Sequence, residues 1–304
     1  MPQFPTGSAT PASIVDALKA VAGDPPKVRA SFAKGRCVRG TYVPSDRAEE
    51  ITRSRSFTRP SRVLARFSVH GGNPDATAAD NLVLRGLSVR LGDLHHRSDI
   101  LAQSAPVHFA RTLDQMLAFL NARIPRPDGS PDIEKVKAFS AANPETLHQA
   151  NYITAHPLPR NFAGTTYWAV HSFPATNSAG ETRYIKFKLA PVGREAGDAT
   201  ARTANFPRDD LEHRIASGDA RFSVMALLDR PGDPTMDVTI RWPDEDKREE
   251  VRLGTIVITG LEPDETCDAF VFDPANLAEG IAHPPDEIFA ARSAAYAISL
   301  AKRR

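Results

Sequence analysis

The sequence has few of the features that would place it at once in a class of proteins. Its 304 residues include only two cysteines, Cys37 and Cys267, which are far apart and show no CxxC spacing. This pattern argues against a zinc site. A single structural disulfide is compatible with two cysteines, but nothing in the sequence indicates one. We expect both residues to be free thiols in a reducing compartment.

Net charge and long apolar runs are also lacking. The 38 Lys and Arg residues nearly balance the 37 Asp and Glu residues, which gives a formal charge of +1. The chain therefore has no overall field that would attract nucleic acid or an anionic membrane. No apolar run approaches the roughly 18 residues of a membrane span, and the first 19 residues do not resemble a secretory signal. We predict a cytoplasmic protein that binds neither nucleic acid nor membrane.

The rest of the composition is that of a globular protein, with 41% hydrophobic and 25% charged residues. No internal repeat or low-complexity linker divides the chain, so we predict one domain over residues 1–304. Predicted strands cover 63–69, 87–91, 166–171, 184–189, 221–228 and 249–258, and the stretch 98–109 is expected to contain a further strand. Predicted helices cover 13–22, 112–121, 132–143 and 285–302. Asn177–Gly180 is expected to form a hairpin turn between 166–171 and 184–189. Central strands with helices around them predict an α+β barrel or wrapped sheet.

The strongest functional signal lies in the predicted C-terminal helix. Arg292 and Tyr296 are four residues apart, so a helix places them on one face within reach of each other. A guanidinium beside a phenol stabilises the phenolate, and a phenolate is one of the few protein ligands of haem iron. Arg303 and Arg304 follow one to two turns later, where they can meet haem propionates. Taken alone, such a pair is more often a surface feature.

Support comes from the segments that precede this pair. The run Phe272-Asp273-Pro274-Ala275-Asn276, followed by Arg292-Ser293-Ala294-Ala295-Tyr296, resembles the proximal segment of catalases. Further segments resemble the family in the same order, at 29–35, 66–69, 84–89, 99–111, 167–173 and 183–188. An ordered match of many segments is far more specific than any single motif. Because little follows Tyr296, the likeness is to the minimal catalase-related peroxidases.

The resemblance implies a fold and a cofactor. The fold would be an antiparallel β-barrel with helices packed outside, and haem b would be buried between the barrel and the C-terminal helix. Tyr296 would ligate the iron and Arg292 would hold its phenolate. The other implied haem residues are Arg29, Arg66 and Arg303 at the propionates, Met116 among the haem contacts, and Ser68 beside the distal base. The implied partners are a peroxide and a small-molecule electron donor, and family members commonly self-associate into homo-oligomers.

The distal side of the site departs from the family. Phe32 stands where the family has its catalytic histidine, and a phenyl ring cannot exchange protons with a peroxide. General acid–base help of this kind is typically worth roughly 10²–10⁴-fold in rate. The distal asparagine is also missing. Ser104 aligns with it best, and Gln103 supplies an amide there only if the alignment slips by one residue.

Three explanations of Phe32 stay open: an engineered substitution in an active enzyme, a natural variant with altered chemistry, or a distal base that has moved. His70, just after the 66–69 segment, is the candidate for a relocated base, although a histidine without proton duty is the more common case. His108 is a second candidate, and we expect both it and His171 to be structural.

The leading functional hypothesis is a haem peroxidase of catalase type that reduces hydrogen peroxide or organic hydroperoxides, with dismutation weakened by Phe32. One alternative is a haem enzyme that rearranges hydroperoxides or inserts oxygen. Another is a haem-binding protein without turnover. A barrel that kept the fold but lost haem is disfavoured by Tyr296, Arg292, Arg29 and Arg66.

Overall fold

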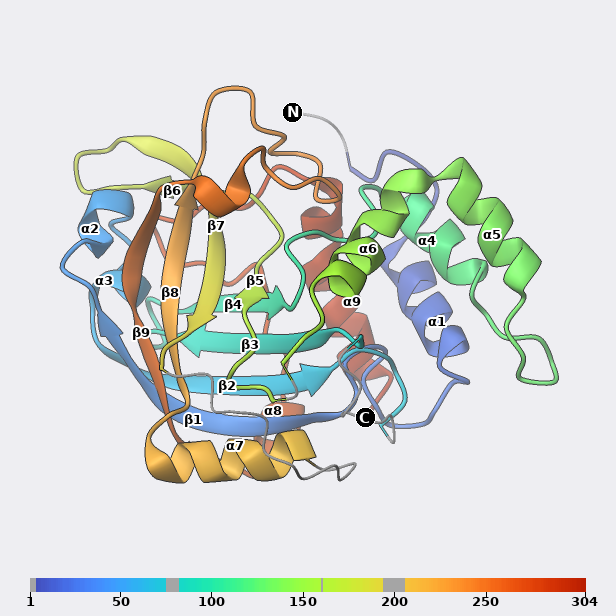
Figure 1. The fold of residues 1–304 in the computed structure, drawn as a ribbon, viewed down its shortest axis with the longest axis horizontal. Coiled ribbons are helices and arrows are strands. Elements are labelled where there is room, and N and C mark those ends of the chain that lie inside the picture. Colours follow the sequence, from blue (N-terminus) through green and yellow to red (C-terminus); the bar gives the residue numbers. More distant parts are fainter. Residues whose placement is uncertain (1–3, 75–81, 160, 194–205) are drawn as a thin grey trace.

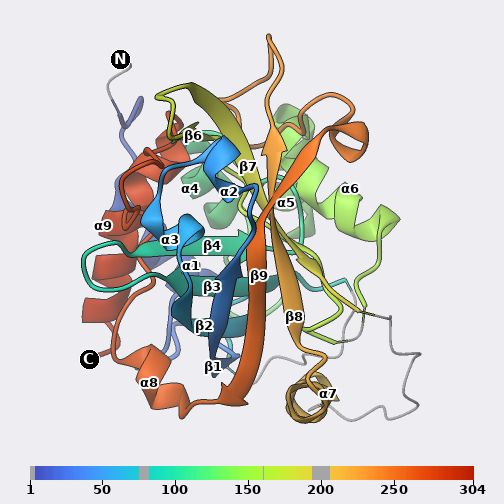
Figure 2. The same cartoon turned by 90° about the vertical axis from the view of Figure 1, so that its left-hand side faces the viewer.

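The computed structural model describes residues 4–74, 82–159, 161–193 and 206–304, and its centre is an antiparallel sheet that closes on itself (Figures 1 and 2). The strands are β1 (Gly35–Pro44), β2 (Ser61–Val69), β3 (Arg85–Leu91), β4 (Ser98–Gln103), β5 (Tyr167–Trp168), β6 (Phe173–Thr176), β7 (Thr182–Pro191), β8 (Arg221–Leu228) and β9 (Glu250–Leu261). Their order is β5-β4-β3-β2-β1-β9-β8-β7-β6, and a pairing of β5 with β7 closes the barrel. The predicted α+β barrel is therefore confirmed.

The barrel is held together by aromatic side chains that its strands direct into one interior. Phe67 of β2, Phe187 of β7 and Phe222 of β8 are fully buried. The Phe67 ring packs against those of Tyr167 and Phe222, with centroids 6.2 and 5.9 Å apart. Burial of each such side chain stabilises the fold by roughly 1.5–3 kcal/mol, so opposite sides of the barrel are joined through a shared core.

The helices gather mainly beside and below the barrel. They are α1 (Pro11–Val21), α2 (Ala48–Ile51), α3 (Arg55–Thr58), α4 (Leu113–Asn121), α5 (Ile133–Ala142), α6 (His148–Ala155), α7 (Phe206–Ser217), α8 (Asp264–Asp268) and α9 (Glu287–Ala301), with 3₁₀ turns at Pro144–Leu147 and Glu245–Lys247. Figure 1 shows α1, α4 and α5 grouped at one side, with α9 between this group and the barrel. Helix α1 contacts both α4 and α9. Helices α1, α4 and α9 therefore form one packed group beside the barrel.

Local signals in the sequence fix where the helices near the site begin. Thr10 caps α1 in a reciprocal capping box with Ser13. Thr112 caps α4 through the backbone N–H of Gln115, and Asp286 caps α9. Each cap satisfies backbone donors that a helix start leaves open, so the helices begin within a few residues of the predicted positions.

The predicted secondary structure is wrong in several details, and helices α6 and α7 were not predicted. Strand β1 was not predicted, because Gly35 and Gly40 interrupt its pattern; a Cβ at Gly40 would lie 2.2 Å from the Val257 carbonyl oxygen of β9. The predicted strand 166–171 shrinks to Tyr167–Trp168. The turn at Asn177–Gly180 joins β6 to β7, not 166–171 to β7, since the chain runs through a second short strand before it turns.

The expectation of free thiols is also wrong. Cys37 of β1 and Cys267 of α8 form a disulfide with their Cα atoms 5.7 Å apart, although 230 positions separate them in sequence. Pairing of β1 with β9 brings them together, because α8 follows β9 directly. The sequence spacing of the two cysteines could not reveal this contact. Because the cysteines are not free thiols, they no longer support the prediction of a reducing compartment. Among the described residues, no helix combines the length and the apolar composition that crossing a membrane requires.

Candidate functional site

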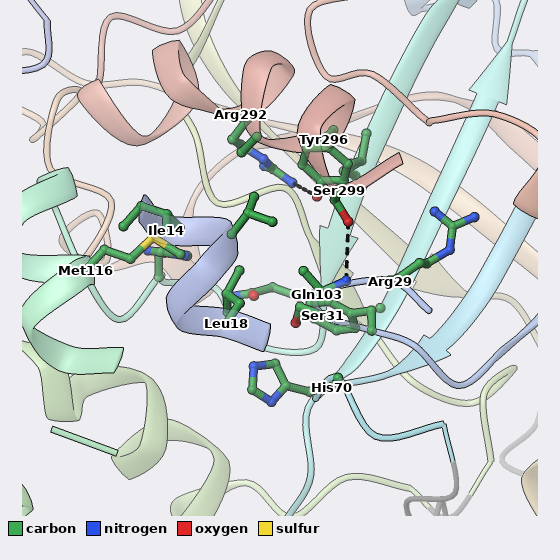
Figure 3. Close-up of a pocket in the computed structure, with 18 of the residues that line it drawn as sticks. Ile14, Leu18, Arg29, Ser31, His70, Gln103, Met116, Arg292, Tyr296 and Ser299 are labelled. Carbon is green, nitrogen blue, oxygen red and sulfur yellow. Dashed lines mark hydrogen bonds between the residues drawn. The ribbon is translucent and has the colours of Figure 1, made fainter. Parts of the chain in front are cut away.

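A cavity of about 490 Å³ lies between the barrel and helices α1, α4 and α9. This volume is in the range that holds cofactors and drug-sized ligands. Figure 3 shows Arg292 and Tyr296 projecting from α9 at one side, His70 at the other, and Leu18 of α1 between them. The described lining contains five arginines but no Asp or Glu side chain, so the cavity favours an anionic ligand.

A chain of four hydrogen-bonded side chains ends at the phenol of Tyr296. Asp286 Oδ2 lies 2.8 Å from His171 Nδ1, and His171 Nε2 lies 2.8 Å from Arg292 Nη1. Arg292 Nη2 donates to the Tyr296 hydroxyl at 3.0 Å. Three of these residues belong to α9 and its cap, and only His171 comes from the barrel, just after β5. These hydrogen bonds therefore hold α9 against the barrel and fix the direction of the phenol.

The protonation states along this chain follow from burial and geometry. Burial lowers the pKa of His171 below its ordinary value, so the imidazole is neutral at pH 7. Its Nδ1–H then donates to Asp286, while Nε2 accepts from Arg292. Burial alone would raise the pKa of Asp286, but the bonds from His171 and from the Phe289 N–H outweigh it and lower that pKa. An ionised carboxylate thus orients an imidazole that orients the guanidinium beside the phenol.

Three other arginines of the cavity lie close enough to repel one another. Burial and the charge of Arg29 lower the pKa of Arg66 to about 9. The same two causes lower the pKa of Arg303 to about 10. The Nε atoms of Arg29 and Arg303 are buried without a hydrogen-bond partner among the described residues. Carboxylates placed here would relieve the repulsion and satisfy these donors.

Arg66 also holds the loop that carries Phe32. Its two terminal nitrogens donate to the backbone carbonyls of Phe32 and Ala33, at 2.9 and 2.8 Å. Phe32 has a φ of +53°, a left-handed conformation that is costly for a bulky side chain. The clamp by Arg66 offsets that cost. A Cβ added to Gly86 would lie 3.0 Å from Phe32 Cδ1 and 2.7 Å from Ser68 Oγ, so these side chains form one wall of the cavity.

His70 faces Phe32 across this wall. Their rings meet edge to face with centroids 5.2 Å apart. The His70 side chain keeps exposed surface inside the cavity, but the surrounding protein desolvates it and lowers its pKa. The imidazole is therefore neutral at pH 7, and its ring nitrogens bond to none of the described residues. A neutral imidazole in this position is able to accept a proton from a ligand.

The comparisons with known proteins agree with this geometry. The model of the family described as Catalase matches residues 27–304. The chain belongs to the catalase family. The sequence resemblance is therefore confirmed, and with it the assignment as an enzyme of catalase type.

Two relatives named catalase-related peroxidase match nearly the whole chain. The chain is 31% identical to a "Catalase-related peroxidase" of Synechococcus elongatus over 99% of this chain and 90% of that protein. It is 28% identical to another of that name from Mycolicibacterium paratuberculosis, covering 98% and 96%. Mouse catalase is 26% identical, but the chain spans only 47% of its length. A solved bacterial catalase superposes with a TM-score of 0.78 at 20% identity, over 100% of this chain and 63% of that one, which supports the fold.

Nearly all of the residues predicted for this catalase-family site lie together. The cavity lining includes Phe32, Ser68 and His70 on the barrel side, Met116 on α4, and Tyr296, Arg292, Arg29, Arg66 and Arg303 on the proximal side and rim. Ser104 does not line it: the residue is fully buried, and its hydroxyl accepts the N–H of Arg85 at 2.9 Å. Gln103 lines the cavity instead, with its Nε2 donating to the Val107 carbonyl at 2.7 Å. Of these two neighbouring residues, Gln103 therefore places its side chain at the cavity and Ser104 does not.

Two residues of the hydrogen-bonded chain were missed as site residues. Asp286 was not predicted as a site residue, and His171 was predicted to be structural. The sequence around Asp286 signals only a helix start, because an Asp before a helix is a common N-cap. His171 carries no signal, since its contact with Arg292 spans 121 positions. His108 lines the cavity and bonds to the Ala110 carbonyl at 2.9 Å.

Proposed function

We propose that this catalase-family protein is a haem b peroxidase in which Tyr296 ligates the iron. The observation that carries the proposal is the bonded chain from Asp286 through His171 and Arg292 to Tyr296, which ends in a phenol that points into the cavity. Because Arg292 donates to the phenol oxygen, it stabilises the phenolate that metal binding requires. The substrates would be hydrogen peroxide or organic hydroperoxides together with a small-molecule electron donor.

The residues of the cavity fit a haem. The group is flat and apolar with two carboxylates, and the cavity has apolar walls with Arg29, Arg66 and Arg303 at one end. The partnerless Nε atoms of Arg29 and Arg303 are the donors that propionates would satisfy. Met116 from α4, which lines the cavity, would be among the residues that contact the haem. When bound, haem iron supplies the electron transfer that peroxide reduction needs.

The distal residues determine what the chain can do with a peroxide. Phe32 cannot take a proton from the substrate or return one, so we expect dismutation of hydrogen peroxide to be weakened by roughly 10²–10⁴-fold. His70 is neutral, lies beside Phe32 and has accessible nitrogens. In the proposal it takes over part of the proton transfer, while Ser68 and Gln103 contribute polar atoms to the same region.

Phe32 also favours a second candidate function. A phenyl ring held beside Gly86 and Ser68 adds apolar surface to the distal wall, which suits an organic hydroperoxide better than hydrogen peroxide. A haem enzyme that rearranges such a hydroperoxide or inserts its oxygen needs less proton transfer than a catalase. A haem-binding protein with no turnover would share the same geometry.

The test uses the haem-loaded protein with two peroxides. We expect donor oxidation with cumene hydroperoxide, and little oxygen release from hydrogen peroxide. Conversion of cumene hydroperoxide without donor oxidation would favour rearrangement, and no reaction with either peroxide would favour simple haem binding. His70→Ala should lower donor oxidation at least tenfold, with His95→Ala, an exposed loop histidine, as the control. Full activity of His70→Ala would exclude the relocated base.

A further inference from the structure

One arginine of the cavity has no place in the haem site. Arg123 follows α4 and lines the cavity far along the chain from the other four arginines. Its guanidinium carbon lies 3.4 Å above the centroid of Phe119, and Nη1 donates to the Phe119 carbonyl at 3.1 Å. Within the described part of the chain, Arg123 forms no ion pair. A partly buried guanidinium without a carboxylate is therefore available to an anionic ligand.

The wall that leads to Arg123 is apolar. The rings of His108, Phe109 and Phe119 stack in a row with successive centroids 4.3 Å apart. Helix α4 adds Leu113 and Leu120, and α1 adds Ile14, Leu18 and Val21. Leu113 and Leu120 are seven residues apart on one helix, so this strip extends about 10 Å. It joins the part of the cavity around Phe32 and Tyr296 to the charge of Arg123.

An apolar strip that ends in a cation matches a particular kind of molecule. This inference rests on the peroxidase function proposed above. We propose that Arg123 binds the carboxylate of an amphiphilic alkyl hydroperoxide, and that the hydrocarbon chain of this ligand lies along the apolar strip of α1 and α4. The planar guanidinium pairs with carboxylates in a fixed, bidentate geometry, and the lining holds no Asp or Glu that would repel the ligand.

Arg123 is thus a specificity-determining residue and takes no part in bond breaking. The overall step is ROOH + 2 e⁻ + 2 H⁺ → ROH + H₂O, in which the O–O bond breaks and the small-molecule donor supplies the electrons and protons. The charge of Arg123 affects how tightly an acid binds. A neutral hydroperoxide has no group for it to recognise.

The experiment compares linoleic acid hydroperoxide, below its micelle concentration, with its methyl ester and with cumene hydroperoxide, using the haem-loaded protein. We expect Arg123→Gln to raise the KM for the acid about tenfold and to leave the KM for the two neutral peroxides unchanged. Arg123→Lys, which keeps the charge but loses the planar fork, should fall between. Arg126→Gln is the matched control, because Arg126 follows closely, is exposed and pairs with Asp132 at 3.0 Å.

Binding of the unreactive hydroxy acid, measured by calorimetry, separates this proposal from the peroxidase function. The dissociation constant should also rise about tenfold in Arg123→Gln, which corresponds to roughly 1.4 kcal/mol, and should not change in Arg126→Gln. Equal binding of the acid and its ester by the wild-type protein would overturn the role of Arg123, as would equal effects of the two substitutions. Arg123-dependent binding without turnover of any peroxide would support the anion site and reject the peroxidase.

Discussion

Removal of the disulfide gives a quantitative test of the fold that does not depend on haem. The Cys37–Cys267 bond closes a loop of 230 residues. The chain-entropy relation assigns such a loop about 5.5 kcal/mol at 25 °C, and native disulfides typically contribute 2–5 kcal/mol. We therefore expect the double variant Cys37→Ala/Cys267→Ala to lose about 4 kcal/mol of unfolding free energy. With an unfolding entropy of about 2.1 cal/mol/K for each of the 304 residues, the melting temperature should fall by about 6 °C.

The assay is calorimetric melting with and without a thiol reductant. The reductant should lower the melting temperature of the wild-type protein and leave the double variant unchanged. Reduction should also weaken the rim of the cavity, since Arg29 Nη2 donates to the Cys267 carbonyl at 2.7 Å and pairs with Asp268 at 3.0 Å. Haem affinity should therefore decrease together with stability. Two alkylatable thiols in the non-reduced native protein, or melting curves unaffected by the reductant, would refute the reasoning.

Three further predictions concern the site. Tyr296→Phe should keep the fold but lose the phenolate-to-iron absorption signature and most haem affinity; an unchanged haem spectrum would reject Tyr296 as the ligand. Phe32→His should raise oxygen release from hydrogen peroxide by roughly 10²–10⁴-fold; no gain would mean that the distal loop, not the missing imidazole, limits dismutation. Burial lowers the pKa of His108 to about 4, so the unfolded chain binds the proton more tightly, and stability should fall as the pH drops from about 6.5 towards 4. His108→Gln should show a shallower fall in melting temperature over that range, and an identical pH profile would contradict the assignment.

Much of the barrel could be predicted because its strands carry local patterns. The segment 221–228 was predicted with the bounds of β8, since polar and apolar residues alternate in its first half and an apolar run completes it. Strand β1 was missed because Gly40 is required by the close approach of β9, a reason that lies in the tertiary structure. The disulfide was missed for the same kind of reason: only the pairing of β1 with β9 brings Cys37 to Cys267.

The two sides of the candidate site differed in how far the sequence could define them. Arg292 and Tyr296 lie one helical turn apart, so helix geometry alone predicts their contact, and the structure has it. The distal side depends on the register of β4, where a shift of one residue decides whether Gln103 or Ser104 faces the cavity. Strand side chains alternate between faces, so an alignment error of one residue exchanges a cavity amide for a buried hydroxyl.

The proximal and distal sides of the candidate site also differ in how substitutions should affect them. The proximal residues are joined by hydrogen bonds that span α9 and the barrel, so a change in any one of them disturbs the position of the phenol. Phe32 stands outside that network among the described residues, and its backbone carbonyl oxygen accepts a hydrogen bond from Arg66. We therefore expect a change of side chain at this position to alter proton transfer and the shape of the pocket without moving the residues proposed to hold the iron. If the proposed function is right, haem binding and peroxide selectivity should vary independently in variants of Phe32.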